Sequence, residues 1–261
     1  MPITFKRAGQ EAVALENVSF KGVVLDKVTF KRAGQEAVTV FEKAAMPVKG
    51  DIITLDSKQY RVLKLNGTVA EVLCMYDANS SIKFDTSSNY NNTYAGKNID
   101  TYCNNTFYNS LSAAMKSAIV DKTFTQDSWE YMSSAPNESH YTGKYGSSTY
   151  YLTLKNAAFG ESITRHCYCL SVQDVIDYLE ATTSMGTSDT TLTDTNVWKM
   201  FWDATTSQSG KFIWLRSACS SIYRAFKVHG NSGYLVSDIV SSTYAARPAF
   251  QIDLSKIAWS K

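Results

Sequence analysis

The sequence has no apolar run that could cross a membrane and no apolar segment close to its start. A membrane helix needs about 20 largely apolar residues, and no window of the chain approaches that length. The opening letters MPITFKRAGQEAV contain none of the apolar stretch that a signal peptide carries. We therefore expect no membrane partner, no signal peptide and a chain that is made in the cytoplasm.

An excess of charge of one sign is missing as well. Lysine and arginine number 26 against 24 aspartate and glutamate residues, which gives a formal net charge of +2. Binding to nucleic acid or to an anionic membrane relies on a concentrated basic surface. Nucleic acid is therefore not expected as a partner.

Cysteines are few, and their number is odd. Five cysteines scattered through a chain of 261 residues argue against a disulfide framework, so we expect reduced thiols. The one cluster of metal-type ligands is His166 with Cys167 and Cys169. On a strand the histidine would face the opposite side from the two cysteines, so the three cannot enclose a zinc ion.

Catalytic signatures are also missing. None of the three histidines lies in a nucleophile elbow, a phosphate-binding loop or a zinc-binding helix motif. Carboxylate pairs such as Asp174 and Asp177 fit helix caps and solvated helix faces. We predict no catalytic residue, no metal and no cofactor.

An internal repeat is the first positive feature of the chain. The letters TFKRAGQEAV at residues 4–13 return unchanged at 29–38, and a degenerate copy, VSFKGVVL, occupies 18–25. Each copy has apolar ends around a charged turn, which predicts short β-hairpins. We assign residues 1–47 to a repeated hairpin module with its linker; an engineered duplication is the alternative.

The remaining residues, 48–261, are predicted to form one larger domain, since 44% hydrophobic content can build a sizeable core. Residues 60–65 and 69–76 flank Asn66-Gly67, a strong hairpin signal. The polar segment 77–109 has little periodicity, and we expect a long surface excursion that is either a binding loop or irregular structure. The Ser/Tyr/Gly-rich segment 123–160 is expected to be a connection.

Three short helices are predicted behind Ser110, Ser171 and Asp194, where apolar residues recur at helical spacing. Asp174 is placed to complete a capping box with Ser171. Strands, then a block of short helices, then strands again indicate an α+β domain. Its other predicted strands are residues 52–55, 167–170, 212–215 and 250–254, the last of them near the first because domain termini often lie close together.

Five segments, taken together and in this order, resemble a C-type-lectin-fold domain. They are GDIITLDSKQYRVLK (50–64), CNNTFYNSLSAAMKSAIVD (103–121), YCLSVQDVIDYL (168–179), FIWLRSA (212–218) and YAARPAFQIDLS (244–255). Such domains occur in phage tail proteins and surface proteins of gut bacteria, including variable proteins of diversity-generating retroelements. The resemblance implies a C-type-lectin-like fold. The opening module is similar to short repeats that attach such domains to a larger particle.

In such variable proteins a diversified segment lies between fixed Trp-Leu-Arg and Arg-Pro-Ala sequences, and template adenines are replaced by any base. Codons ending in C or T cannot specify Lys, Glu, Gln, Met or Trp. Residues 217–244 contain one lysine, Lys227, and none of the other four. The resemblance therefore implies a variable region at about 217–244, with Lys227 as a fixed position.

The polar middle of this region has the composition of an antibody paratope, in which tyrosine gives rigid contact area and serine, glycine and asparagine give adaptable hydrogen bonds. We predict Tyr223, Arg224 and Tyr234 as anchors of ligand contact; an ordinary polar loop is the alternative. The predicted contact residues are Ser220, Ser221, Ile222, Tyr223, Arg224, His229, Asn231, Tyr234, Ser237, Asp238, Ile239, Ser241 and Ser242. The predicted scaffold residues are Trp214, Leu215, Ala225, Phe226, Val228, Leu235, Val236 and Val240.

These observations lead us to expect a non-enzymatic receptor-binding or tropism protein, in a phage tail or in the cytoplasm before assembly. Its partners would be a cell-surface protein or glycan, a particle bound through the opening module, and further copies of itself. No calcium is implied, because the Glu-Pro-Asn, Gln-Pro-Asp and Trp-Asn-Asp triplets of sugar-binding C-type lectins are missing. Two alternatives stay open: an oxidase resembling formylglycine-generating enzymes, in which Cys219 would act, and a purely structural virion module.

Overall fold

The chain divides into two units, Met1–Met46 and Pro47–Lys261, one residue from the boundary expected from the sequence. The computed structural model describes residues 3–5, 13–15, 19–20, 23–24, 27–30, 38–42, 45–87, 91–183, 192–202, 211–229 and 233–261. Each unit is described by itself.

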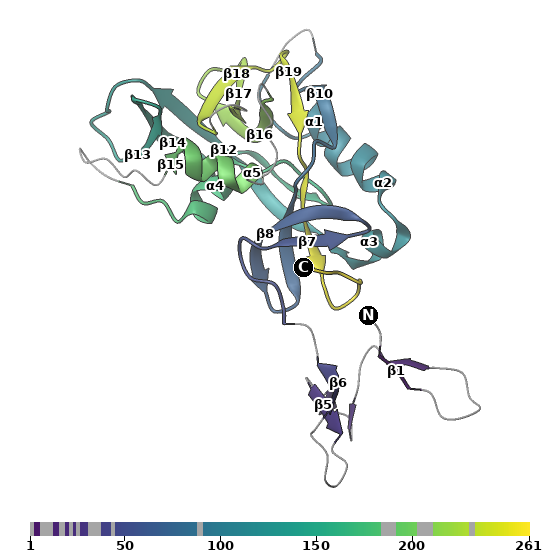
Figure 1. Cartoon of the computed structure of the whole chain (residues 1–261). Helices are drawn as coiled ribbons and strands as arrows, with labels where there is room; N and C mark the ends of the chain where they lie inside the picture. The colour runs from purple at the N-terminus through teal and green to yellow at the C-terminus, as the bar shows by residue number, and fades with distance from the viewer. Residues whose placement is uncertain are drawn as a thin grey trace. The chain divides into compact units, whose positions relative to one another are not determined.

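In its described residues the first unit contains three two-stranded antiparallel pairs, which agrees with the hairpins predicted from the repeat (Figure 1). In the two identical copies the pairing is equivalent, because Phe5 lies opposite Val13 and Phe30 lies opposite Val38. Identical sequence thus gives identical register. The strands are β1 (Ile3–Phe5) with β2 (Val13–Leu15), β3 (Ser19–Phe20) with β4 (Val23–Val24), and β5 (Lys27–Phe30) with β6 (Val38–Glu42).

A five-stranded sheet joins the two ends of the second unit. Its order is β11-β20-β9-β8-β7. The last strand pairs with β9, with Phe250 opposite Val72, and a further bridge links Thr54 to Ser260. The expected hairpin is present: Asn66 pairs with Val69, and Gly67 takes a positive φ of 60° that favours glycine. The strands are β7 (Ile52–Leu55), β8 (Lys58–Asn66), β9 (Val69–Cys74), β11 (Ile119–Val120) and β20 (Ala249–Asp253).

The second sheet of this unit is mixed and has nine strands. Seven of them follow the order β10-β19-β16-β12-β14-β13-β15, and β17 and β18 branch from β16. Figure 1 shows β16 to β19 gathered beside β10. Its strands are β10 (Asn79–Lys83), β12 (Lys122–Met132), β13 (Tyr141–Tyr145), β14 (Ser148–Arg165), β15 (Leu192–Thr193), β16 (Ile213–Cys219), β17 (Arg224–Val228), β18 (Leu235–Ile239) and β19 (Thr243–Ala246). The unit is a sheet-dominated α+β structure.

The helices are short. They are α1 (Asn98–Thr101), the π-helical segment η1 (Tyr102–Phe107), α2 (Tyr108–Ser110), α3 (Ala113–Ala118), α4 (Val172–Leu179) and α5 (Asp194–Phe201). The capping box of Ser171 and Asp174 is confirmed at the start of α4. The other two predicted starts are displaced: Ser112 caps α3 in place of Ser110, and Thr193 caps α5 in place of Asp194.

Two segments that we expected to be irregular are ordered elements of the fold. Residues 77–109 contain β10 and most of a helical run, with Ile99, Cys103 and Phe107 buried at a spacing of four residues. Residues 123–160 lie mainly in β12, β13 and β14, which form an antiparallel sheet. Serine, tyrosine and glycine suggested a connection, but tyrosine, like the threonines of this segment, favours strands.

The strand expected at 167–170 is reduced to a single bridge between Tyr168 and Ala249. His166 contacts Asp121 and stacks on Tyr108. Cys167 and Cys169 are buried free thiols, as expected.

Candidate binding surface

The loop between β16 and β17 is where the predicted contact residues become exposed. Every residue of β16 is buried, whereas Ser220, Ser221, Ile222, Tyr223 and Arg224 are all exposed. Ile222 is 57% exposed and Tyr223 is 53% exposed. The chain therefore passes directly from the core to the surface at Ser220.

A buried asparagine from a distant segment fixes the backbone of this loop. The Nδ2 atom of Asn92 donates to the carbonyl oxygens of Cys219 at 2.7 Å, Ser221 at 2.9 Å and Arg224 at 2.9 Å. Asn92 is itself held through its carbonyl, which accepts a hydrogen bond from Gln126. All three acceptors on the loop are backbone atoms, so these contacts do not involve the side chains that the loop carries.

Strands β17 and β18 form a ribbon whose inner side is the predicted scaffold. They pair from Arg224 opposite Ile239 to Val228 opposite Leu235. Seven of the eight scaffold residues are buried, namely Trp214, Leu215, Ala225, Phe226, Val228, Leu235 and Val240. Val236 is only half-buried, which corrects its place in the predicted scaffold.

Lys227 is the one residue of the predicted variable region that codons ending in C or T cannot specify. It belongs to β17 and is buried. Its Nζ donates to Asp238 at 2.6 Å and lies 4.0 Å from the ring centre of Phe212 and 3.9 Å from that of Tyr244. The hydroxyl of Tyr244 also donates to Asp238, at 2.6 Å. Burial alone would raise the pKa of Asp238, but these hydrogen bonds outweigh it and lower the pKa. Asp238, a predicted ligand contact, is half-buried, and its carboxylate neutralises Lys227.

The free edge of β18 is partly closed by the segment's own groups. In the antiparallel pairing, Tyr234 bonds to His229 and Val240 bonds to Tyr223, so Ser237 and Ile239 direct their backbone groups outward. The Ile239 N–H donates to the Asp238 carboxylate at 2.7 Å, and the Ile239 carbonyl accepts from the Ser242 N–H at 2.8 Å. Arg224 donates to the Ser237 carbonyl at 3.3 Å. Such closure disfavours the addition of a partner strand.

The opposite end of the ribbon carries stacked rings. The ring of Tyr234 stacks on that of His229 at 4.7 Å and on that of Tyr145 at 4.4 Å. Burial and the nearby charge of Lys227 lower the pKa of His229, which favours the neutral ring. His229 and Tyr234 are half-buried.

The predicted contact set is thus divided between two ends of one ribbon. Ser220 to Arg224 and Ile239 lie at one end, and His229 and Tyr234 lie at the other. Ser237, Ser241 and Ser242 are half-buried. Asn231 lies outside the described residues.

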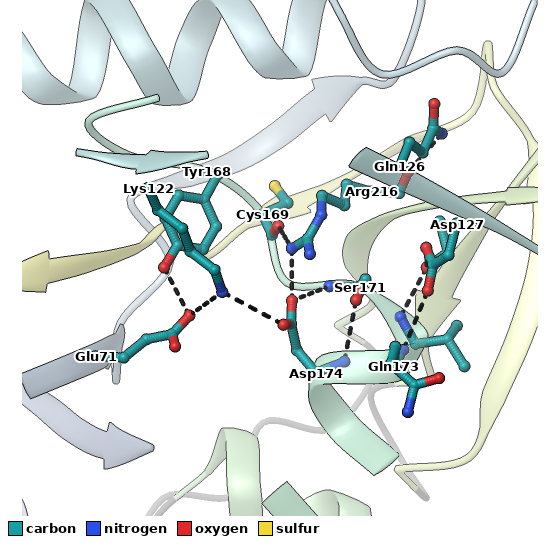
Figure 2. Close-up of polar contacts among 12 residues, drawn as sticks. Glu71, Lys122, Gln126, Asp127, Tyr168, Cys169, Ser171, Gln173, Asp174 and Arg216 are labelled. Carbon is teal, nitrogen blue, oxygen red and sulfur yellow. Dashed lines mark hydrogen bonds and ion pairs between the residues drawn. The ribbon is translucent and has the colours of Figure 1, made fainter. Parts of the chain in front are cut away.

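An ionic network at the N-terminus of α4 holds β16, the strand that leads into the surface loop (Figure 2). Arg216 donates to Asp174 at 2.5 Å and to the Cys169 carbonyl at 2.7 Å. Asp174 is also 3.5 Å from Lys122, whose Nζ donates to Glu71 at 2.6 Å. Burial would raise the pKa of Asp174, but the charges of Arg216 and Lys122 hold it far below the usual range.

The same region satisfies the first N–H groups of α4. The hydroxyl of Ser217 accepts from the Val172 N–H at 2.7 Å and donates to Asp127 at 2.5 Å. Asp127 also accepts from the Gln173 N–H at 3.2 Å, and a carboxylate at a helix N-terminus is favoured by the helix dipole. Strand β16 and helix α4 are therefore joined side by side through fixed polar contacts.

Sequence reasoning missed two residues of this surface, Asn92 and Tyr145. Asn92 stands in a polar run, NYNNT, in which nothing marks one asparagine as buried. Tyr145 has a weak local signal, since KYGSS places an aromatic residue directly before a glycine turn.

Cys219 is buried, and its sulfur lies near the Ser220 hydroxyl at 3.9 Å. A close pair of thiols does exist in the described chain, Cys103 and Cys169, whose sulfurs are 3.6 Å apart in the core. Burial raises the pKa of the Cys103 thiol well above its usual value. This pair involves no residue of the predicted surface.

The structure defines a sheet-dominated α+β unit that displays a polar and aromatic ribbon on a buried frame. By sequence the chain belongs to the family described as "Domain of unknown function (DUF6273)", whose family model matches residues 67–254. No curated protein matches the chain, and no solved structure does. Among the helices of the described ranges, none combines the length and apolar character of a membrane span.

Proposed function

We propose that the chain is a non-enzymatic binding protein of the C-type-lectin-like fold whose C-terminal surface recognises a ligand on a cell. Its opening hairpin module would attach the domain to a larger particle such as a phage tail. The surface would be the diversified segment of a retroelement system. In this proposal the fold is kept constant while the specificity changes.

The observation that carries the proposal is the separation of exposed and buried residues within one segment. Five consecutive predicted contacts, Ser220 to Arg224, are exposed, while the frame residues Ala225, Phe226, Val228 and Leu235 are buried. Asn92 holds the loop through backbone carbonyls alone. A surface built in this way can change its side chains without losing its shape, which a purely structural module does not require.

The composition of the segment supports the diversified origin. Lys227 is the residue that adenine replacement in such codons does not explain, and it is the one that the structure holds inside, between Asp238 and two aromatic rings. A fixed role in the frame accounts for that exception. The diversification is tested by the neighbouring DNA, where we expect a reverse transcriptase and a near-copy of the coding sequence of residues 214–250 that differs at adenines.

Binding is tested with the full chain, fluorescently labelled, on a panel of intact gut bacteria and measured by flow cytometry. We expect saturable binding to some cells and a loss of at least tenfold in the variant Tyr223→Ala/Arg224→Ala, because exposed tyrosine and arginine are frequent anchors of binding. The matched control is Val48→Ala/Lys64→Ala, which removes one exposed apolar and one basic side chain elsewhere. Equal binding by wild type and the first variant would refute the proposal, as would no binding to any cell.

A further inference from the structure

Tyr145 comes from the β13–β14 hairpin, outside the predicted variable region, yet it lies against that region. Tyr145 is 41% exposed. It stacks on Tyr234 at 4.4 Å with an interplanar angle of 24°, and it lies 5.9 Å from His229. A residue that belongs to another part of the chain therefore shares a surface with two predicted contacts.

The hairpin presents Tyr145 from a fixed position. Tyr150, opposite Gly143 in the pairing, covers that glycine so closely that an added Cβ would lie 2.0 Å from its ring carbon Cζ. The Tyr150 hydroxyl donates to the Leu192 carbonyl at 3.2 Å, and its ring contacts Tyr234 at 5.9 Å. Because the hairpin is already ordered, little conformational entropy would be lost when Tyr145 meets a partner.

Exposed apolar side chains gather on this face beside polar ones. Four of the six large apolar side chains that are exposed in the described chain lie here: Ile222, Tyr223 and Ile239 at one end of the ribbon, and Tyr145 at the other. Ile222 and Ile239 offer a sugar neither a hydrogen bond nor a flat ring. Exposed apolar side chains that are grouped on one face are typical of contact with protein.

One of the two cations of this face is neutralised. Lys227 and Asp238 form an ion pair with one another, whereas the exposed Arg224 keeps its charge and bonds to the Ser237 carbonyl. The partly closed edge of β18 favours contact through side chains over an added strand. The ribbon from Tyr223 to His229 spans about 20 Å, which fits within one standard protein interface of about 800 Å² on each side.

We infer that the partner of the proposed binding surface is a protein, and that Tyr145 is an additional contact residue which extends the surface beyond the variable region. This inference rests on the proposed function. A protein partner would pack apolar side chains against Ile222, Tyr223 and Ile239 at one end of the ribbon and against Tyr145 at the other. Tyr145 would supply a contact that stays the same while the contact residues of the variable region change.

The test uses the labelled full chain on bacterial cells that bind it. Cells are treated with proteinase K, which removes surface protein, or with periodate, which oxidises glycans. We expect proteinase K to lower binding more than tenfold and periodate to lower it less than twofold. Loss of binding after periodate but not after proteinase K would identify a glycan and overturn the inference.

The role of Tyr145 is tested by Tyr145→Ala, with Leu154→Ala as the matched control. Leu154 is 39% exposed on the same hairpin, six residues beyond Ser148, the pairing partner of Tyr145, or about 20 Å along the strand. We expect about a tenfold loss for Tyr145→Ala, as for a moderate hot spot, and wild-type binding for Leu154→Ala. Thermal unfolding checks each fold, and Tyr145→Ser replaces the alanine variant if that variant does not fold.

The outcomes distinguish failure of the Tyr145 inference from failure of the proposed function. Wild-type binding by Tyr145→Ala, with loss in Tyr223→Ala/Arg224→Ala, would overturn the role of Tyr145 and leave the proposed function standing. Wild-type binding by both would overturn the proposed function itself. Equal losses in Tyr145→Ala and Leu154→Ala would show that the hairpin acts only through the fold.

Discussion

The ionic network of Glu71, Lys122, Asp174 and Arg216 and the surface loop that follows β16 use polar residues in opposite ways. In the network each charged side chain is fixed by the side chain of another residue. In the loop the backbone is fixed, by Asn92, and the side chains are left to the solvent. Arg216 and Arg224 therefore stand eight residues apart in sequence under very different constraints. Tolerance to substitution in this chain therefore depends on whether side-chain atoms or backbone atoms make the contacts that hold a segment.

The largest expected effect comes from breaking the network. Arg216→Ala leaves Asp174 without its buried guanidinium partner and removes the bond to the Cys169 carbonyl. Loss of one partner of a buried ion pair costs about 3–5 kcal/mol, so the free energy of unfolding should fall by that amount. Urea unfolding of the full chain measures it.

Arg224→Ala is the control for this measurement. The side chain is exposed and makes one long hydrogen bond, so its removal should change the free energy of unfolding by less than about 0.5 kcal/mol. Similar destabilisation in the two variants would contradict the contrast between network and loop.

The second largest effect is expected when the Asn92 side chain, the clamp that holds the backbone of the loop, is removed. Asn92→Ala deletes three hydrogen bonds and takes the side-chain donor from the carbonyls of Cys219, Ser221 and Arg224, and buried groups left unsatisfied cost about 1–3 kcal/mol. Urea unfolding measures the loss in the free energy of unfolding. Amide hydrogen exchange at Arg224 and Val240 should also become faster, because their N–H groups donate to carbonyls of the loop, those of Ser221 and Tyr223.

Asn91→Ala serves as the adjacent control, because Asn91 is exposed and its side chain bonds only within its own turn, to Thr93. Unchanged exchange of the loop amides in Asn92→Ala would mean that the clamp does not hold the loop.

Acid should weaken the ionic network and the ribbon of β17 and β18 through their aspartates. The pKa values of Asp174 and Asp238 are lowered in the folded chain. A carboxyl group whose folded pKa lies below its unfolded value of about 3.9 stabilises the fold above that pH and loses this contribution as the pH falls toward the folded pKa. The urea midpoint should be steady from about pH 7 to 5 and decline below about pH 4.

The variant Lys227→Met sharpens this prediction. It removes the main partner that lowers the pKa of Asp238, so the decline of the urea midpoint with acid should become shallower than in the wild type. An acid dependence as steep as that of the wild type would show that the pair contributes little. Network residues are unchanged in this variant, so their share of the acid dependence remains.

Local patterns in the sequence predicted the elements whose signals are local. The Asn66-Gly67 hairpin, the capping box of Ser171 and Asp174, and the duplicated hairpins all follow from residues a few positions apart. The helical run before α3 had such a signal in Ile99, Cys103 and Phe107, but the asparagines and threonines between them concealed it.

Contacts between distant residues could not be predicted in this way. Asn92 bonds to carbonyls more than 120 positions away, and Glu71 meets Lys122 from another sheet. In the candidate surface, residue type separated the buried frame from the exposed loop. It could not show that Asp238 pairs with Lys227, because nothing close to Asp238 in the sequence marks its ion-pair partner.

The smallest effect is expected from replacing the exposed side chains of the loop, and it tests most directly whether the loop tolerates substitutions that the buried residues do not. Ser220, Ser221, Ile222 and Tyr223 can be replaced together, for example by Asn, Thr, Asp and Ser, with a total change in the free energy of unfolding of no more than about 1 kcal/mol, since exposed sites away from special contacts have small effects. The four replacements leave the carbonyls that Asn92 holds in place. Four matched replacements in the frame, at Ala225, Phe226, Val228 and Leu235, should prevent folding, because each is fully buried. Thermal unfolding of the two variants compares them directly, and loss of the folded state in the loop variant would mean that the loop's shape depends on its side chains after all.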